Sequence, residues 1–236
     1  MENQFTQNLN RWSREVADGC HEIAVNPDCD MDLDFYAFQS KVNYQPELMV
    51  IGSNPGGNEK YSEMNRKRGR ERREADDLGI CNCNQFLAND GWGSMRSLCD
   101  LFSGAVLRPV FEEAVVTNVV YFNTGTFREF QRRMNRGGRE AVLFCVEKTV
   151  ELICDVVRPR HMLLMGKSAQ EHLVRYFDKP LQPLLVTPAE GWNLIRETTI
   201  DGIPTYCIHH PALNHKFNTG KNQELKRKMF ETIFSK

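Results

Sequence analysis

Long apolar runs are missing from this sequence of 236 residues. No stretch approaches the roughly 20 apolar residues that a membrane-spanning helix needs, and the N-terminal MENQFTQNLNRW lacks the apolar centre of a signal peptide. The eight cysteines have no regular spacing, and three of them, Cys99, Cys145 and Cys154, fall in helix-like or core-like patterns. Such cysteines indicate reduced thiols rather than a disulfide framework. We therefore expect a cytoplasmic protein with no membrane association.

An excess of charge of one sign is also missing, because 30 Lys and Arg face 31 Asp and Glu, for a net charge of -1. This balance excludes a globally basic nucleic-acid-binding protein, so any such surface must come from local clusters. Residues 66–73 hold six basic residues and one acidic residue, and residues 127–139 hold five arginines and one glutamate. These clusters indicate either phosphate contacts or a solvated face of the molecule.

Several motifs of nucleotide-binding and hydrolytic enzymes are absent. The glycine-rich turn GSNPGG, which follows an apolar run, is not continued by Gly-Lys-Ser/Thr and does not match G-x-G-x-x-G. This excludes the phosphate-binding loop of nucleotide hydrolases and the dinucleotide fingerprint. Neither Ser53 nor Ser168 lies in G-x-S-x-G, which disfavours a serine hydrolase of that type.

Metal-binding spacings are incomplete in the same way. The acidic segment 28–39 begins like a calcium loop, but Leu33 and Gln39 stand where such a loop needs Gly and Glu, so we expect a solvated, helix-capping turn. The sequence CNC at residues 81–83 is not Cys-x-x-Cys, and the histidines of HHPALNH have no second cluster with matching spacing. We expect neither a metal nor a cofactor.

Apolar periodicity predicts strands that alternate with helices. Strands are expected at residues 48–51, 114–122 and 161–166 and in the segments PLLVT, NLIRETTI and IPTYCIHHP, the last two joined by a hairpin turn at Asp201-Gly202. Helices are expected at residues 5–17, 92–102, 139–157, 167–177 and 221–234. This order predicts one α/β domain over residues 1–236, a three-layer α/β/α sandwich around a mostly parallel sheet of four to five strands. Residues 1–45 form its N-terminal helical segment, and residues 58–90 form a basic insertion loop. The charged part of this insertion, residues 58–77, has too little apolar content to pack and is expected to be a loop or an exposed helix.

Three polar segments follow the predicted parallel strands: GSNPGG, NTGTF and HHPALNH. In open sheets of this kind, ligands bind at the carboxyl ends of the strands. Two glycines around a proline let the first of these turns approach a ligand closely. The sequence therefore predicts a ligand site at this edge.

These segments carry a resemblance to the uracil-DNA glycosylase superfamily. Its G-x-N-P-G turn is similar to residues 52–56, GSNPG, and its His-Pro turn is similar to residues 210–212, HPA. VVTNVVYF resembles the family's T-N-V-V strand, and CVEKTVELICDVVRPRHMLLMGKSA resembles its helix, strand and small-residue turn. The match runs in order from about residue 47 to residue 213, and this order makes it more specific than any single motif.

The resemblance implies roles for particular residues. Asn54 would orient water at the sugar carbon, and His210 would hydrogen-bond the departing base as negative charge grows there. Asn118 would read the base, although a strand Asn can instead satisfy only local backbone groups. Leu213 would enter the space left by the flipped nucleotide, unless it packs under its own loop. The remaining residues implied for the base pocket are Gly52, Ser53, Pro55 and Gly56, with Tyr61, Phe86 or Trp92 as the stacking ring, and those implied for DNA binding are Asn214, His215, Arg66, Lys67, Arg68, Lys167 and Ser168.

The sequence departs from the family after the first turn. The compact segment with a Pro-Phe pair, which closes uracil pockets, is replaced by a longer basic segment, and the cysteine spacing of iron-sulfur branches is absent. We expect a monomeric DNA glycosylase for uracil or for a bulkier base such as hydroxymethylated or glucosylated cytosine of phage DNA, the latter in antiviral defence. A non-catalytic nucleic-acid-binding module and a nucleoside hydrolase are the alternatives.

Overall fold

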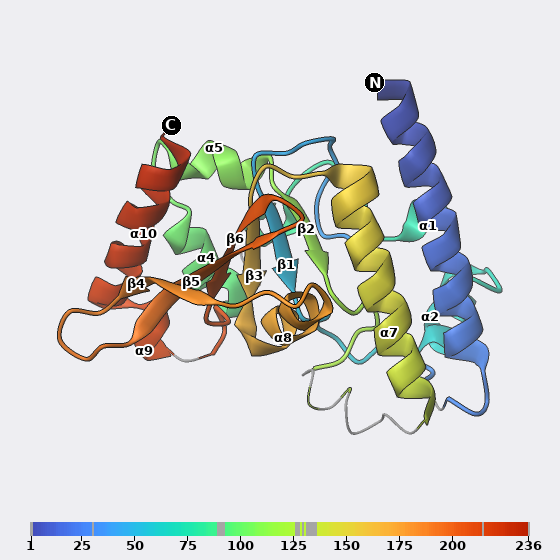
Figure 1. Ribbon diagram of the computed structural model, residues 1–236. Helices are drawn as coiled ribbons and strands as arrows, with labels where there is room; N and C mark the ends of the chain where they lie inside the picture. The colour runs from blue at the N-terminus through green and yellow to red at the C-terminus, as the bar shows by residue number, and fades with distance from the viewer. Residues whose placement is uncertain are drawn as a thin grey trace.

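The computed structural model of the chain describes residues 2–29, 31–88, 93–125, 128, 130, 136–213 and 215–235. Its centre is a six-stranded sheet with the order β2-β1-β3-β6-β5-β4 (Figure 1). Strands β2, β1, β3 and β6 are parallel, and β5 and β4 follow as antiparallel neighbours. The strands are β1 Met49–Gly52, β2 Val115–Asn118, β3 Met162–Met165, β4 Gln182–Val186, β5 Asn193–Ile200 and β6 Ile203–Ile208. The predicted mostly parallel α/β sheet is confirmed, and the predicted count of four to five strands is too low because β4 pairs with β5 at the edge.

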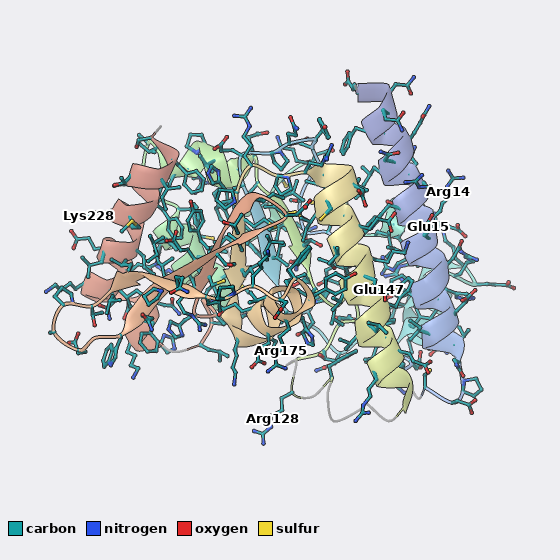
Figure 2. The ribbon with its side chains drawn as sticks, in the orientation of Figure 1. Arg14, Glu15, Arg128, Glu147, Arg175 and Lys228 are labelled. Carbon is teal, nitrogen blue, oxygen red and sulfur yellow. The ribbon has the colours of Figure 1, made fainter. Side chains whose placement is uncertain are left out.

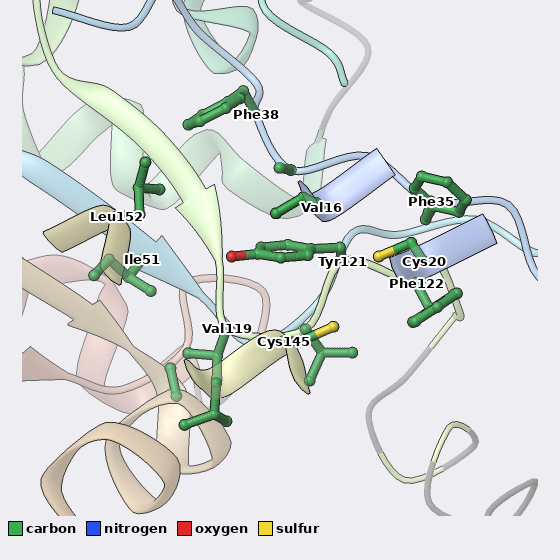
Figure 3. Packing of buried hydrophobic residues seen from close by; sticks show 14 of the residues in the cluster. Val16, Cys20, Phe35, Phe38, Ile51, Val119, Tyr121, Phe122, Cys145 and Leu152 are labelled. Atoms are coloured by element: carbon green, nitrogen blue, oxygen red, sulfur yellow. The ribbon is translucent and has the colours of Figure 1, made fainter. Parts of the chain in front are cut away.

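The buried strands send alternate side chains to the two faces of the sheet. In the first strand Met49 and Ile51 join one apolar cluster, whereas Leu48 and Val50 join the other. Period-two alternation produces this division, and a strand covered on both faces reads as a continuous apolar run. Figure 3 shows the first cluster, in which Ile51 lies in one core with the buried ring of Tyr121.

Helices cover both faces of the sheet. One face carries α1 (Glu2–Val25), α7 (Arg136–Glu151), its π-helical continuation η3 (Leu152–Val157) and α8 (Gly166–Tyr176). The other carries α3 (Gln85–Ala88), α4 (Arg96–Leu101), α5 (Leu107–Glu112) and α10 (Gly220–Phe234). The short helices α2 (Tyr61–Arg68), α9 (His215–Asn218), η1 (Ala75–Asp77) and η2 (Gly93–Met95) lie in the connections. Within the described residues, no helix has the length and apolar content needed to span a membrane.

The N-terminal helix is longer than predicted, since it reaches Val25 rather than residue 17. Its buried stripe continues through Cys20 and Ala24, and Trp12 donates a hydrogen bond from Nε1 to the Lys148 carbonyl at 2.8 Å. The helix therefore lies against α7, as Figure 1 shows. The helix predicted over 92–102 is shorter in the structure, and residues 89–92 lie outside the described residues.

The basic segment does pack, contrary to expectation. Tyr61 and Asn65 of α2 are buried, and Arg73 is only 4 % exposed. The packing is apolar at Tyr61, which belongs to the core, and polar elsewhere, because Arg68 and Arg73 both bind the buried carboxylate of Asp34. An apolar-periodicity argument cannot detect such a contact.

The acidic segment that precedes it was predicted to be a solvated turn that caps a helix. In the structure Asp32 caps a helix, whereas Asp34 is buried. Asp32 accepts hydrogen bonds from the backbone N–H and the hydroxyl of Ser62, at 2.8 and 2.7 Å, in the first turn of α2. This is a capping contact. Asp34 instead is 3 % exposed.

The predicted hairpin between β5 and β6 is confirmed. Asp201 and Gly202 both have positive φ, 49° and 77°. Two successive positive φ values are the mark of a type I′ turn.

Candidate active site

The segments that leave the four parallel strands meet at one edge of the sheet. They line two cavities of about 620 and about 990 Å³. We name the first the β2-side cavity, because it reaches Asn118 at the end of β2, and the second the α8-side cavity, because it runs along α8. Both cavities are lined by Ser53, Asn54, Gly56, Met95 and His210. The predicted convergence of GSNPGG, NTGTF and HHPALNH at this edge is thus confirmed for their described residues.

The amide of Asn54 is held in one orientation. Its Nδ2 donates to the carbonyl oxygens of Pro55 and Thr124, at 2.9 and 3.0 Å, and lies 2.9 Å from Thr124 Oγ1. Because carbonyl oxygens only accept, these partners fix which end of the amide is nitrogen. No described residue donates to Asn54 Oδ1, which leaves a hydrogen-bond acceptor where the two cavities meet.

The ring of His210 is fixed in one tautomer. Its Nδ1 accepts the backbone N–H of Ala212 at 3.2 Å, so the proton of the neutral ring resides on Nε2. Burial lowers the pKa of His210, and the ring is therefore neutral near pH 7. His210 is thus a neutral donor that lines the same two cavities as Asn54.

The position of His210 depends on Gly166, the first residue of α8. A Cβ added to Gly166 would lie 3.0 Å from His210 Cβ and 3.2 Å from its Cδ2. Gly166 also has a φ of +82°, which side chains rarely tolerate. The two segments that form this wall can approach each other only because residue 166 is glycine.

A second glycine makes room for Asn118. The two residues are paired in the register of β1 and β2, and a Cβ on Gly52 would lie 2.5 Å from Asn118 Oδ1. The Asn118 side chain is 4 % exposed and lines the β2-side cavity, with its Nδ2 3.5 Å from Gln39 Oε1. No backbone group bonds the Asn118 side chain within the described residues, so the structure favours an Asn that faces the cavity over one that satisfies its own strand.

The loop that carries His210 is anchored from beneath by two residues that the sequence did not single out. Asn218 Nδ2 donates to the carbonyls of His210 and Leu213, at 2.9 and 2.8 Å. Lys226 Nζ, on a residue only 1 % exposed, donates to Asn218 Oδ1 at 2.7 Å. Lys226 lies on the buried face of α10, between Gln223 and Phe230. A lysine on the buried face of a helix is the sequence feature that could have identified this residue.

The three aromatic candidates for a stacking ring have different positions. Phe86 is 5 % exposed and lines the β2-side cavity. Tyr61 instead lies in the core, where it stacks on Phe35 and its hydroxyl bonds the His21 ring and the Arg73 backbone. Trp92 lies outside the described residues. Of the two described candidates, the structure brings only Phe86 to the site.

The predicted DNA-binding residues also separate. Arg66 and Lys67 are exposed, but Arg68 turns inward, where its guanidinium binds Asp34 at 2.9 Å and Asp77 at 3.6 Å. The expectation that Arg68 contacts phosphate is therefore not supported, because two carboxylates already engage it. Leu213 is 60 % exposed beside the shared wall, which excludes packing under its own loop. Lys167 and Ser168 line the α8-side cavity, His215 is exposed at the start of α9, and Asn214 lies outside the described residues.

Charge differs between the two cavities. Beyond Asn118, the wall of the β2-side cavity contains Asp34, Glu59, Arg68 and Arg73, which largely neutralise one another. The α8-side cavity is lined by cations with a single carboxylate, Glu171, among the described residues. These cations are Arg128, Lys167, Arg175 and Arg196, of which Figure 2 shows Arg128 and Arg175 projecting near the same edge.

The described residues contain no group of three or more His, Cys, Asp or Glu arranged to hold a metal ion. No protein-family model matches the sequence, and no curated protein is significantly similar to it. The functional argument therefore depends on the geometry: a residue with an oriented amide, Asn54, and a neutral donor, His210, each line both the polar and the basic cavity.

Proposed function

We propose that this protein is a DNA glycosylase of the uracil-DNA glycosylase type, which hydrolyses the bond between a flipped base and its deoxyribose. One observation carries the proposal: Asn54, with its oriented amide, and His210, with its neutral Nε2–H donor, both line both cavities. A base in the β2-side cavity and its strand in the α8-side cavity would place the glycosidic bond at these two residues. Extrusion of the nucleotide is required because the bond is inaccessible in a stacked duplex.

The reaction needs two electrostatic contributions. As the bond from C1′ to the base nitrogen breaks, its electron pair leaves with the base and positive charge develops on the sugar. His210 donates to a carbonyl oxygen of the base as that oxygen becomes negative. Asn54 Oδ1 accepts a hydrogen bond from the water whose oxygen joins C1′, and the released proton passes to solvent or to the departing base.

An amide is too weak a base to remove a proton from water before the bond breaks. Asn54 therefore suits a mechanism in which departure of the base comes first and water addition follows. The neutral His210 complements this order, since a donor without charge of its own stabilises the base most as its anionic character grows.

The size and polarity of the β2-side cavity favour a second candidate, a glycosylase for a substituted pyrimidine such as hydroxymethylated or glucosylated cytosine. A volume of about 620 Å³ exceeds what one pyrimidine ring requires. Polar side chains line it, among them Gln39, Glu59 and Asn123, whose Nδ2 donates to Glu59 Oε2 at 2.6 Å. Such side chains can form hydrogen bonds with a hydroxylated substituent. Such a substrate would make the protein a defence factor against phage.

The test is to incubate the protein with matched DNAs that carry uracil, hypoxanthine, 5-hydroxymethylcytosine or glucosylated hydroxymethylcytosine, and to score abasic sites. We expect release from at least one of them, and none by the Asn54→Ala variant. Release from uracil DNA alone would reject the substituted-pyrimidine candidate. Binding to DNA without release from any member of the panel would instead favour a non-catalytic nucleic-acid-binding module.

A further inference from the structure

The far end of the α8-side cavity contains an arginine held by a buried amide. Arg196 of β5 donates from Nη2 to Gln170 Oε1, and Gln170 Nε2 donates to the Ile208 carbonyl at 2.9 Å. Gln170 is 4 % exposed, whereas Arg196 is half-buried and lines the cavity. The amide thus orders the guanidinium, while most of the five N–H donors of the arginine remain available.

Arg196 differs in its partners from Lys167 and Arg175, two other cations of this cavity. Lys167 and Arg175 lie 3.5 and 3.9 Å from Glu171, and their side chains are 84 % and 80 % exposed. No described carboxylate forms an ion pair with Arg196. A charge that is ordered, partly desolvated and unneutralised is suited to bind an anion, because little side-chain entropy remains to be lost.

The register of the sheet places Arg196 near the proposed reaction centre. It pairs with Cys207 across β5 and β6, three residues before His210. At about 3.3 Å per residue, this separation is roughly 10 Å along the strand direction. At 3.4 Å per nucleotide along the axis of one strand, such a distance corresponds to at most about three nucleotides.

We propose that Arg196, held by Gln170, is a binding subsite for one backbone phosphate of the substrate strand, at most about three nucleotides from the flipped nucleotide. This inference rests on the proposed function, because it requires DNA in the α8-side cavity. An arginine can bind two phosphate oxygens with parallel hydrogen bonds. The subsite would fix the position of the strand while Asn54 and His210 act on the base.

The experiment uses DNA with a tetrahydrofuran abasic analogue, which binds without turnover whatever the preferred base. A series of strands carries one uncharged methylphosphonate linkage, moved by one position at a time, and the dissociation constant is measured for each. For the wild-type protein we expect neutralisation of one linkage within about three nucleotides of the analogue to weaken binding about 10-fold, through loss of a charged hydrogen bond.

The variants identify the partner of that linkage. Arg196→Gln should bind the all-phosphate DNA about 10-fold more weakly and should be insensitive to the same methylphosphonate, whereas Arg175→Gln should stay as sensitive as the wild type. Gln170→Leu, which keeps the charge but frees the guanidinium, should lose part of the sensitivity. A thermal unfolding curve for each variant controls for folding.

Two contrary results are distinguishable. If Arg196→Gln remains as sensitive to every methylphosphonate as the wild type, the phosphate subsite is rejected and the proposed function is untouched. If the wild-type protein binds no analogue DNA, the proposed function fails and the subsite fails with it.

Discussion

The β2-side and α8-side cavities share Asn54 and His210 but use arginine in opposite ways. In the first, Arg68 and Arg73 turn toward the buried Asp34 and become part of the framework. In the second, Arg196 is ordered by the uncharged amide of Gln170, and no described carboxylate neutralises its charge. The most arginine-rich stretch of the sequence therefore does not supply the most basic cavity, because the partner of an arginine decides what it can bind.

The largest effect is expected from removing the acceptor that both cavities share. Asn54→Ala should reduce base release by several orders of magnitude, since water is no longer oriented at the sugar. DNA binding should survive, because no phosphate contact is lost. The two quantities are measured separately, by abasic-site formation and by fluorescence anisotropy. Loss of both together, or of neither, would contradict the role of Asn54.

Removing the donor should have the next largest effect. His210→Ala is expected to slow cleavage about 100-fold, as for deletion of one preorganised donor to a developing anion. Burial lowers the pKa of His210 from its ordinary 6.5, so the wild-type rate should hold steady at neutral pH and decline only below that value. His209→Ala is the matched control and should have a smaller effect, because His209 stacks on Phe217 instead of lying at the shared wall. Equal effects of the two substitutions would indicate that His210 is structural.

The framework role of the β2-side arginines predicts a stability effect. Asp34→Asn should lower the free energy of unfolding by about 3 kcal/mol, because it leaves Arg73 buried with only Asp77 as an anionic partner. Asp18→Asn removes the exposed pair with Arg72 and should cost at most about 1 kcal/mol. Urea denaturation of both variants makes the comparison. A similar small loss in each would show that the Asp34 cluster does not hold the cavity wall together.

The last effect is spread over a range of pH and concerns the lysine beneath the His210 loop. Burial lowers the pKa of Lys226 from 10.5 to about 8, so between these values the unfolded chain binds a proton that the folded chain has lost. The free energy of unfolding should therefore rise with pH from 8 to 10.5 relative to Lys226→Met, by at most about 1.4 kcal/mol per pH unit and at most about 3.5 kcal/mol in all. Lys228→Met, at an exposed position, should keep the wild-type rise. Parallel curves for the wild type and Lys226→Met would refute the buried, neutral amine.

Much of the fold follows from local pattern. The four-residue run 48–51 and the Asp201-Gly202 turn each carry a specific signal, a doubly covered strand and a tight hairpin, and both are present. The pattern was less informative where polar groups replace apolar ones. Segment 58–77 has few apolar residues, yet it packs through Arg68 and Arg73, because a buried ion pair between segments distant in sequence has no periodicity.

The candidate site shows the same limit. Asn54 and His210 could be selected from the turns that carry them, since Asn-Pro-Gly and His-Pro mark where strands end. The residues that hold the site in place could not be selected in this way. Thr124 holds Asn54, Asn218 holds the His210 loop, and Gln170 holds Arg196, all through contacts that sequence patterns do not show. Periodicity identifies what a helix buries, and hydrogen-bond partners across the fold become visible only in three dimensions.

The two glycines that admit Asn118 and His210 restrict how the sequence of this protein can diverge. A side chain at Gly52 would collide with Asn118, and one at Gly166 would crowd His210 while holding a strained φ. Any relative in which Asn118 and His210 have the same positions should therefore carry glycine at both sites, however different its surface residues are. Together with Asn54 and His210, these two glycines form a four-residue sequence signature. The signature should distinguish distant relatives that have the same site from proteins that have only the Asn-Pro-Gly and His-Pro turns.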